Sequence, residues 1–178
     1  MRKTITALAA RQQNLLPAGS IWKYLDDASL PGAFWNGSGP FDDSAWPSGP
    51  AQLGYGDGDE ATTLTFGGDP NNKTITTYYR KAFVVTNATQ ITNLIAHVIR
   101  DDGVVVYLNG QEAFRDNLPG GAINFATLAL TAIAGAQESI AFITDIVPVA
   151  GLINGTNILA AEIHQQSGKS HPFYARCK

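Results

Sequence analysis

Apolar and polar positions alternate with a period of two along several stretches of the chain. The clearest stretch covers residues 74–85, where Tyr79 and Phe83 belong to one face and Tyr78 and Arg80 to the other. A period of two is that of a β-strand, whose successive side chains point to opposite faces of a sheet. The predicted strands are 21–25, 74–85, 91–100, 104–108, 111–115, 139–147 and 157–164, with weaker candidates at 51–55, 62–66 and 124–128.

Two of these regions carry further information. Residues 91–100 are apolar on both faces, which is typical of a central strand and places His97 in the core. The pair Asn109-Gly110 separates 104–108 from 111–115 and suits a two-residue type I′ turn, because both turn positions need a positive φ. The chain is therefore predicted to form a β-hairpin there.

The segments between the strands define the fold class. Residues 26–50 form a long loop that carries Phe34, Trp35 and Trp46, and we expect this loop to fold back as a lid. Many short strands joined by Gly, Pro and Asn turns predict an all-β, single-domain jelly-roll β-sandwich of two antiparallel sheets. We expect residues 1–16 to be an arm or short helix, residues 17–167 the sandwich and residues 168–178 a C-terminal tail.

Composition excludes several classes of protein. Charged residues make up 15% of the 178, and the net charge is -3, so nucleic-acid binding is not expected. No apolar run approaches the ~20 residues that cross a bilayer, so membrane insertion is not expected either. Met1-Arg2-Lys3 is followed by an apolar segment too short for a conventional signal peptide. The single cysteine, Cys177, excludes a disulfide within the chain and leaves cross-linking of two chains as the less favoured alternative to a free thiol.

Four sequence blocks point to a known kind of module. They are WPSGPAQLGYGD at 46–57, TYYRKAF at 77–83, DDGVVVYLNG at 101–110 and GTNILAAEIHQ at 155–165. In this order they resemble the galactose-binding-like jelly-roll modules appended to bacterial secreted and surface proteins, including phosphoesterases, glycosidases and lamin-tail-type proteins. The resemblance implies a non-catalytic module. Such modules usually continue into one more apolar strand, for which this sequence offers only a stub at 173–175. We therefore expect a sheet edge with unpaired backbone groups, covered by residues 1–16, by another chain or by water.

Carboxylates gather at predicted strand ends. Asp101-Asp102 lies between two strands, and Asp57 and Asp59 follow Tyr55 in a glycine-rich loop. Carboxylate oxygens are the ligands that Ca²⁺ prefers, so these four aspartates are candidate calcium ligands. The structural alternatives are that Asp101-Asp102 caps a turn and pairs with an arginine, and that the second loop is simply solvated.

A second group of polar residues is a candidate ligand site. Glu162 and His164 are two residues apart on one face of a predicted strand, where Arg80 or Arg100 can join them in hydrogen bonds to a sugar. The alternative is a buried polar cluster that holds the sheets in register. Aromatic residues including Trp35 and Tyr78 offer a stacking platform, although most rings are expected to be packed.

These observations predict a non-catalytic recognition or assembly module. We expect it on a virion or cell surface, associated with other chains of the same assembly as a homo-oligomer or larger particle, with carbohydrate as its ligand. A purely structural capsid- or tail-decorating subunit is the alternative, and a hydrolase is a more remote one. The candidate ligand-binding residues are Tyr55, Asp57, Asp59, Arg80, Arg100, Asp101, Asp102, Glu162 and His164.

Overall fold

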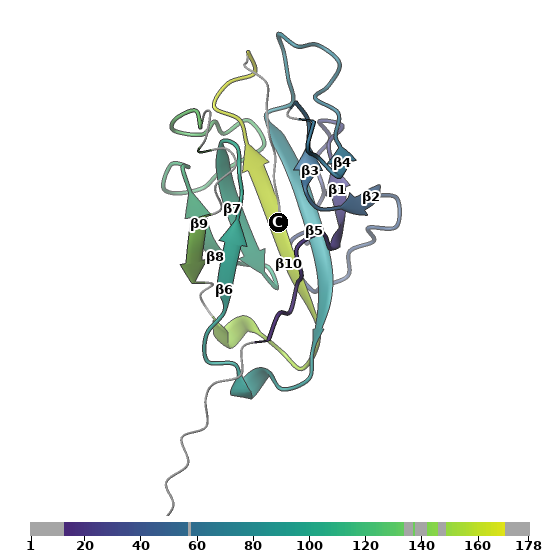
Figure 1. Ribbon diagram of the computed structural model, residues 1–178, viewed down its shortest axis with the longest axis vertical. Helices are drawn as coiled ribbons and strands as arrows, with labels where there is room; N and C mark the ends of the chain where they lie inside the picture. Colours follow the sequence, from purple (N-terminus) through teal and green to yellow (C-terminus); the bar gives the residue numbers. More distant parts are fainter. Residues whose placement is uncertain (1–12, 57, 134–136, 138–141, 146–148, 170–178) are drawn as a thin grey trace, which may run out of the picture.

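A six-stranded antiparallel sheet forms the body of the computed structural model, which describes residues 13–56, 58–133, 137, 142–145 and 149–169 (Figure 1). The spatial order is β2-β1-β5-β10-β7-β8. The strand bounds are Ser48–Pro50 for β2, Ile21–Leu25 for β1, Thr76–Val85 for β5, Gly155–His164 for β10, Gly103–Leu108 for β7 and Gln111–Asp116 for β8. The two longest strands, β5 and β10, pair over their full ten-residue lengths at the centre of the sheet.

A smaller second layer covers one face of this sheet. It consists of β6 (Ile95–Val98) and β9 (Phe142–Asp145), which pair antiparallel and lie in front of the large sheet in Figure 1. A short parallel pair, β3 (Leu53–Gly54) with β4 (Thr62–Thr63), lies beside β1 and β5. The 3-10 turns η1 (Ala88–Gln90) and η3 (Val149–Gly151) lie at one end. The all-β fold with two antiparallel layers is confirmed.

Strand alternation builds the core between the layers. Tyr79, Val104, Ala161 and Ile163 project from one face of the large sheet and are almost fully buried, packing with Val98 of β6. Burying an apolar side chain contributes about 1.5–3 kcal/mol, so this face supplies most of the stability of the sandwich. The opposite face carries the even-numbered residues of β5 and β10 and is covered by loops rather than by a sheet.

The strongest local signals correspond to observed elements. The strand at 21–25 has the predicted bounds, and β5 and β10 cover most of 74–85 and 157–164. The predicted hairpin is present as β7 and β8, with Asn109 at φ 51° and Gly110 at φ 88°. Both φ values are positive, as the type I′ turn requires.

Other expectations were wrong. Residues 91–100 do not form a central strand, because β6 spans only Ile95–Val98 and pairs with β9 alone among the described residues. His97 is exposed on that pair rather than in the core. Residues 124–128 form turns.

The unfinished edge stays a prediction, because the segments 1–12 and 170–178, which could cover or complete it, lie outside the described residues. β10 lies between β5 and β7, so both of its sides are paired, and among the described strands β2 and β8 are the edges of the large sheet. Cys177, most of the predicted arm and the end of the predicted tail lie outside the described residues. No helix within the described part of the chain is long and apolar enough to span a membrane.

Candidate functional site

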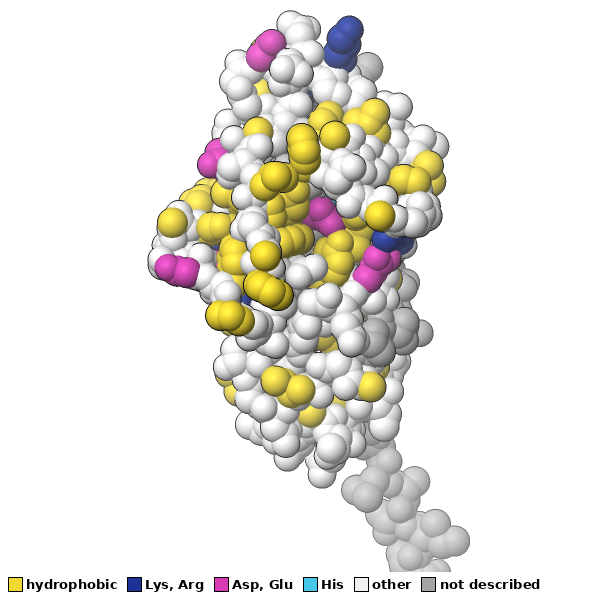
Figure 2. All heavy atoms as spheres, turned by 180° about the vertical axis from the view of Figure 1, so that it is seen from behind, with side chains coloured by type: hydrophobic (Ala, Val, Ile, Leu, Met, Phe, Trp, Pro, Cys, Tyr) yellow, Lys and Arg dark blue, Asp and Glu magenta, His cyan; other side chains and the backbone are white. Residues whose placement is uncertain are grey.

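A cleft of about 420 Å³ opens on the loop-covered face of the large sheet. Figure 2 shows the molecule from behind the view of Figure 1, and hydrophobic side chains gather there around a hollow that contains an acidic group. Two loops, 26–46 and 117–131, border the cleft, and strands β5, β7 and β10 form its floor. The lining residues are Leu30, Pro31, Gly32, Trp35, Tyr78, Tyr107, Ile123, Asn124, Phe125 and Glu162.

Glu162 is the charged group at the floor. Strand alternation directs it away from the core, and its side chain is 8% exposed. Its Oε1 accepts a hydrogen bond of 2.5 Å from the Tyr107 hydroxyl, and its Oε2 lies 3.3 Å from Nε2 of the fully buried His164. Each carboxylate oxygen can accept more than one hydrogen bond, so Glu162 retains acceptor capacity toward the cleft.

His164 is held by groups behind the cleft floor. Its Nδ1 lies 2.7 Å from the carbonyl oxygen of Thr127 and 3.0 Å from Oγ1 of Thr76. A carbonyl only accepts, so Nδ1 carries a hydrogen. Nε2 faces Oε2 of Glu162 and has no hydrogen-bond partner among the described residues. His164 therefore lies directly behind Glu162 and does not reach the cleft itself.

Aromatic rings form the walls. Trp35 meets Tyr78 edge-on with ring centroids 5.0 Å apart, and it meets Tyr107 with centroids 5.7 Å apart. Burial, helped by the negative charge of Glu162, raises the pKa of Tyr78 to about 12. Burial and the hydrogen bond to Glu162 also raise the pKa of Tyr107. Both phenols are therefore neutral at physiological pH.

Arg80 anchors the loop that carries Trp35. Its buried guanidinium donates from Nη1 to the carbonyl oxygens of Trp35 (2.5 Å) and Gly37 (2.8 Å), and from Nε to Oδ2 of Asp43 (2.9 Å). The group also lies 5.2 Å from the ring centroid of Phe41. A guanidinium is suited to this task because its fork of donors can bind several oxygens at once. Arg80 positions the cleft wall, and its donors are directed at the loop.

Eight of the nine predicted site residues lie in the described part of the chain, and they do not all line the cleft. Glu162 lines the cleft, with His164 behind it and Arg80 beneath the loop. Arg100 pairs with Asp116 near one edge of the sheet. Tyr55 is buried against Phe66, outside the cleft.

Three of the four predicted calcium ligands lie in the described part of the chain. Asp102 is buried and accepts backbone N–H groups of Ile133 (2.6 Å) and Gln166 (2.7 Å), so it ties two loops to a strand end. Asp59 is exposed and accepts a hydrogen bond from Gln52, whereas Asp101 is buried. Asp57 lies outside the described residues. Among the residues that the structure describes, no three His, Cys, Asp or Glu side chains are grouped for a metal ion, and calcium binding stays a prediction.

Two aromatic residues of the cleft were not anticipated from the sequence. Tyr107 lies in an apolar strand, whose pattern predicts a core residue. Phe125 was placed on a strand that is not formed. Tyr107 reaches Glu162 only because β7 and β10 are neighbours, with Val105 opposite Glu162. The alternation within 103–108, which separates Tyr107 from Val104 and Val106, was the available signal.

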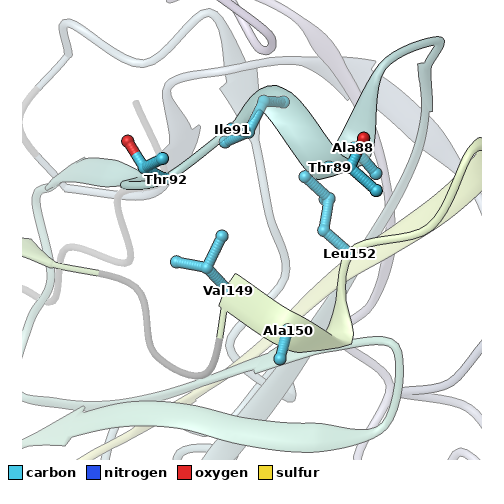
Figure 3. A pocket seen from close by; sticks show the side chains of 7 residues that line it. All are labelled: Ala88, Thr89, Ile91, Thr92, Val149, Ala150 and Leu152. Carbon is cyan, nitrogen blue, oxygen red and sulfur yellow. The ribbon is translucent and has the colours of Figure 1, made fainter.

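A second cavity offers no comparable chemistry. It has a volume of about 280 Å³ and lies between η1 and η3 at one end of the molecule (Figure 3). Its lining is aliphatic apart from two threonines: Ala88, Thr89, Ile91, Thr92, Val149, Ala150 and Leu152. The aromatic cleft is therefore the candidate functional site.

Solved structures share this fold, although no family model and no curated protein matches the chain. A β-glucuronidase from Bacteroides uniformis superposes with a TM-score of 0.56 at 15% identity, over 94% of this chain and 17% of that chain. B. uniformis β-glucuronidase 2, covalently bound to cyclophellitol-6-carboxylate aziridine, superposes with a TM-score of 0.56 at 16% identity, over 94% of this chain and 17% of that chain. A β-glucuronidase from glycoside hydrolase family 2 superposes with a TM-score of 0.52 at 15% identity, over 89% of this chain and 15% of that chain.

The chain thus spans about a sixth of each of these enzymes. At such low identity the likeness shows the β-sandwich fold alone.

Proposed function

We propose that this protein is a non-catalytic carbohydrate-recognition module and that the aromatic cleft is its binding site. The observation that carries the proposal is the combination of four aromatic side chains with one recessed carboxylate in a single cleft. Small-molecule sites are typically concave and mostly apolar, with a few polar groups that fix the orientation of the ligand. This cleft has that composition.

The chemistry of a sugar ring complements the lining. The C–H groups of a pyranose face pack against the rings of Trp35 and Tyr78, whose π faces are electron-rich. A sugar hydroxyl donates to Glu162, whose carboxylate strengthens the hydrogen bond because it is ionised. The charge of the carboxylate and the shape of the aromatic walls then fix which face of the ring is bound.

The same geometry supports a role in binding rather than in turnover. Most glycosidases use two carboxyl groups that flank the scissile bond. Among the described residues that line the cleft, Glu162 is the one carboxylate. The similar solved structures are far larger enzymes, of which this fold is a minor part. We therefore propose that the module serves a catalytic or surface-attached partner and works outside the cell.

A glycan array followed by calorimetric titration tests the proposal. We expect binding to a restricted set of glycans, and we expect Tyr107→Phe and Glu162→Gln to weaken it by at least about tenfold. Tyr24→Phe and Glu60→Gln are matched controls, because both residues lie outside the cleft lining. Failure to bind any glycan, or equal binding by all four variants, would refute the proposal.

A structural subunit is the second candidate function. Large apolar side chains on the two bordering loops are exposed, with Leu30 and Phe34 at 64%, Phe125 at 52% and Leu130 at 61%. Exposed apolar patches often mark protein–protein contacts. Sedimentation distinguishes the candidates, because a subunit should self-associate without any glycan, whereas the recognition module should bind its ligand as a monomer.

A further inference from the structure

We infer that the aromatic cleft binds neutral pyranose units and excludes uronates, the anionic sugars on which the similar enzymes are named to act. This inference rests on the proposed function and specifies its ligand class. It starts from the charges around the cleft. Of the ten described residues in the lining, Glu162 is the one carboxylate, and none is Lys, Arg or His.

The nearest cations are already occupied. Arg80 donates to two loop carbonyls and to Asp43 beneath the cleft wall. Arg115 lies on β8, where its Nε and Nη2 each donate over 2.6 Å to the carboxylate of Glu112. Its Nη1 donates to the carbonyl oxygens of Pro119 and Gly121. Neither guanidinium contributes to the lining, so neither is placed to neutralise an anionic ligand.

The polar groups at and behind the cleft floor also favour a neutral ligand. His164 is fully buried behind Glu162, and its Nδ1 is bound to Thr127, so the ring presents no donor to the cleft. The Tyr107 hydroxyl donates its hydrogen to Glu162 rather than to a ligand. The floor therefore presents an acceptor surface, which suits the hydroxyl donors of a neutral sugar.

A uronate would meet two penalties in this setting. Its carboxylate would lose water without gaining a cationic partner, which is costly in an apolar site. It would also lie near Glu162, and like charges repel more strongly in a partly buried cleft than in water. Together these effects should weaken uronate binding by more than about tenfold relative to the neutral sugar of the same stereochemistry.

Carboxyl reduction provides a matched pair of probes. Carbodiimide activation followed by borohydride reduction converts each uronate of a glycan into the neutral hexose and leaves its linkages and ring stereochemistry intact. An array should carry uronate-containing glycans, their carboxyl-reduced counterparts and naturally neutral glycans. Hits should then be titrated by calorimetry against the wild-type protein, Glu162→Gln and the control Glu60→Gln, which lies outside the cleft lining.

The expected result is binding to neutral and carboxyl-reduced glycans, with the parent uronates more than about tenfold weaker. Glu162→Gln should narrow that ratio, because the repelling charge is removed, whereas Glu60→Gln should leave it unchanged. Equal or stronger binding of the parent uronates would overturn the inference while leaving carbohydrate recognition standing. Binding to no glycan would overturn both. A ratio unchanged in Glu162→Gln would refute the assigned role of Glu162.

Discussion

Replacing Arg80 with methionine tests how the cleft is built. The side chain fills a buried position, and its guanidinium makes hydrogen bonds to the carbonyls of Trp35 and Gly37 and to the carboxylate of Asp43. Methionine approximates the volume of the aliphatic stem but supplies no donor. The substitution therefore removes the polar anchor of the loop while leaving much of the apolar packing in place.

The size of the effect follows from these contacts. Hydrogen bonds to a charged group contribute about 1.5–3 kcal/mol each, and breaking a buried ion pair costs about 3–5 kcal/mol. Asp43 is one-third exposed and regains water, which lowers the cost. We expect a loss of about 3 kcal/mol in the free energy of unfolding, equivalent to about 1–2 M in the urea midpoint.

Function should be affected by the same change. The loop segment 30–35 forms one wall of the cleft, and its release means that Leu30 and Trp35 must be ordered again when a ligand binds. Ordering a side chain costs about 0.5–1.5 kcal/mol, so glycan affinity should fall about tenfold.

Lys23→Met is the matched control for stability. Lys23 donates to the carbonyls of Asp43 and Trp46 in the same loop, but its side chain is 34% exposed, so the loss should stay below about 1 kcal/mol. Urea unfolding and calorimetric titration measure the two effects. If Arg80→Met unfolds no earlier than Lys23→Met, or if it binds glycan as tightly as the wild type, the assigned role of Arg80 is wrong.

Three further predictions concern stability. Asp102→Asn should lower the free energy of unfolding by about 2–3 kcal/mol, because its new NH₂ group faces a backbone N–H donor; an unchanged urea midpoint would contradict this. Because the pKa of Tyr78 is raised in the folded protein, the unfolded chain loses the phenolic proton at a lower pH than the folded protein does. The stabilisation from the neutral phenol is therefore complete below pH 10 and is lost as the pH rises from the ordinary pKa of 10.0 to about 12. In Tyr78→Phe the unfolding midpoint should fall less steeply over this pH range, and an equally steep fall would argue against burial as the cause. Calcium at the four predicted aspartates should raise the melting temperature above that measured in chelator, and identical temperatures would count against the site.

Local signals explain why much of the fold was predictable. Alternation over 74–85 and 157–164 reports which residues share a face, because that geometry belongs to the strand itself. The turn at Asn109-Gly110 was predictable for the same reason, since its positive φ values depend on the two residues alone. Where the pattern was ambiguous, as in 91–100, an apolar run on both faces did not reveal how many neighbours the strand would have.

The candidate site was predictable only in part. Glu162 was singled out because it shares one face of a strand with His164, and in the structure it accepts a hydrogen bond from Tyr107 and lies 3.3 Å from His164. For Asp101-Asp102 the sequence left two alternatives open, a ligand site and a cap for the turn. The structure turns Asp102 toward backbone amides. Nothing in the two residues distinguishes these outcomes, because the deciding amides come from segments 31 and 64 positions away.

By itself, the sequence determined the strands, the hairpin and the two faces of each long strand, because these depend on near neighbours and on the period of the backbone. The tertiary structure alone decided that β10 lies between β5 and β7, which brings Tyr78, Tyr107 and Glu162 onto one surface. It also decided that Arg80 holds the loop bearing Trp35 above that surface. Strand order and loop docking depend on contacts between residues far apart in the chain, which no local pattern records.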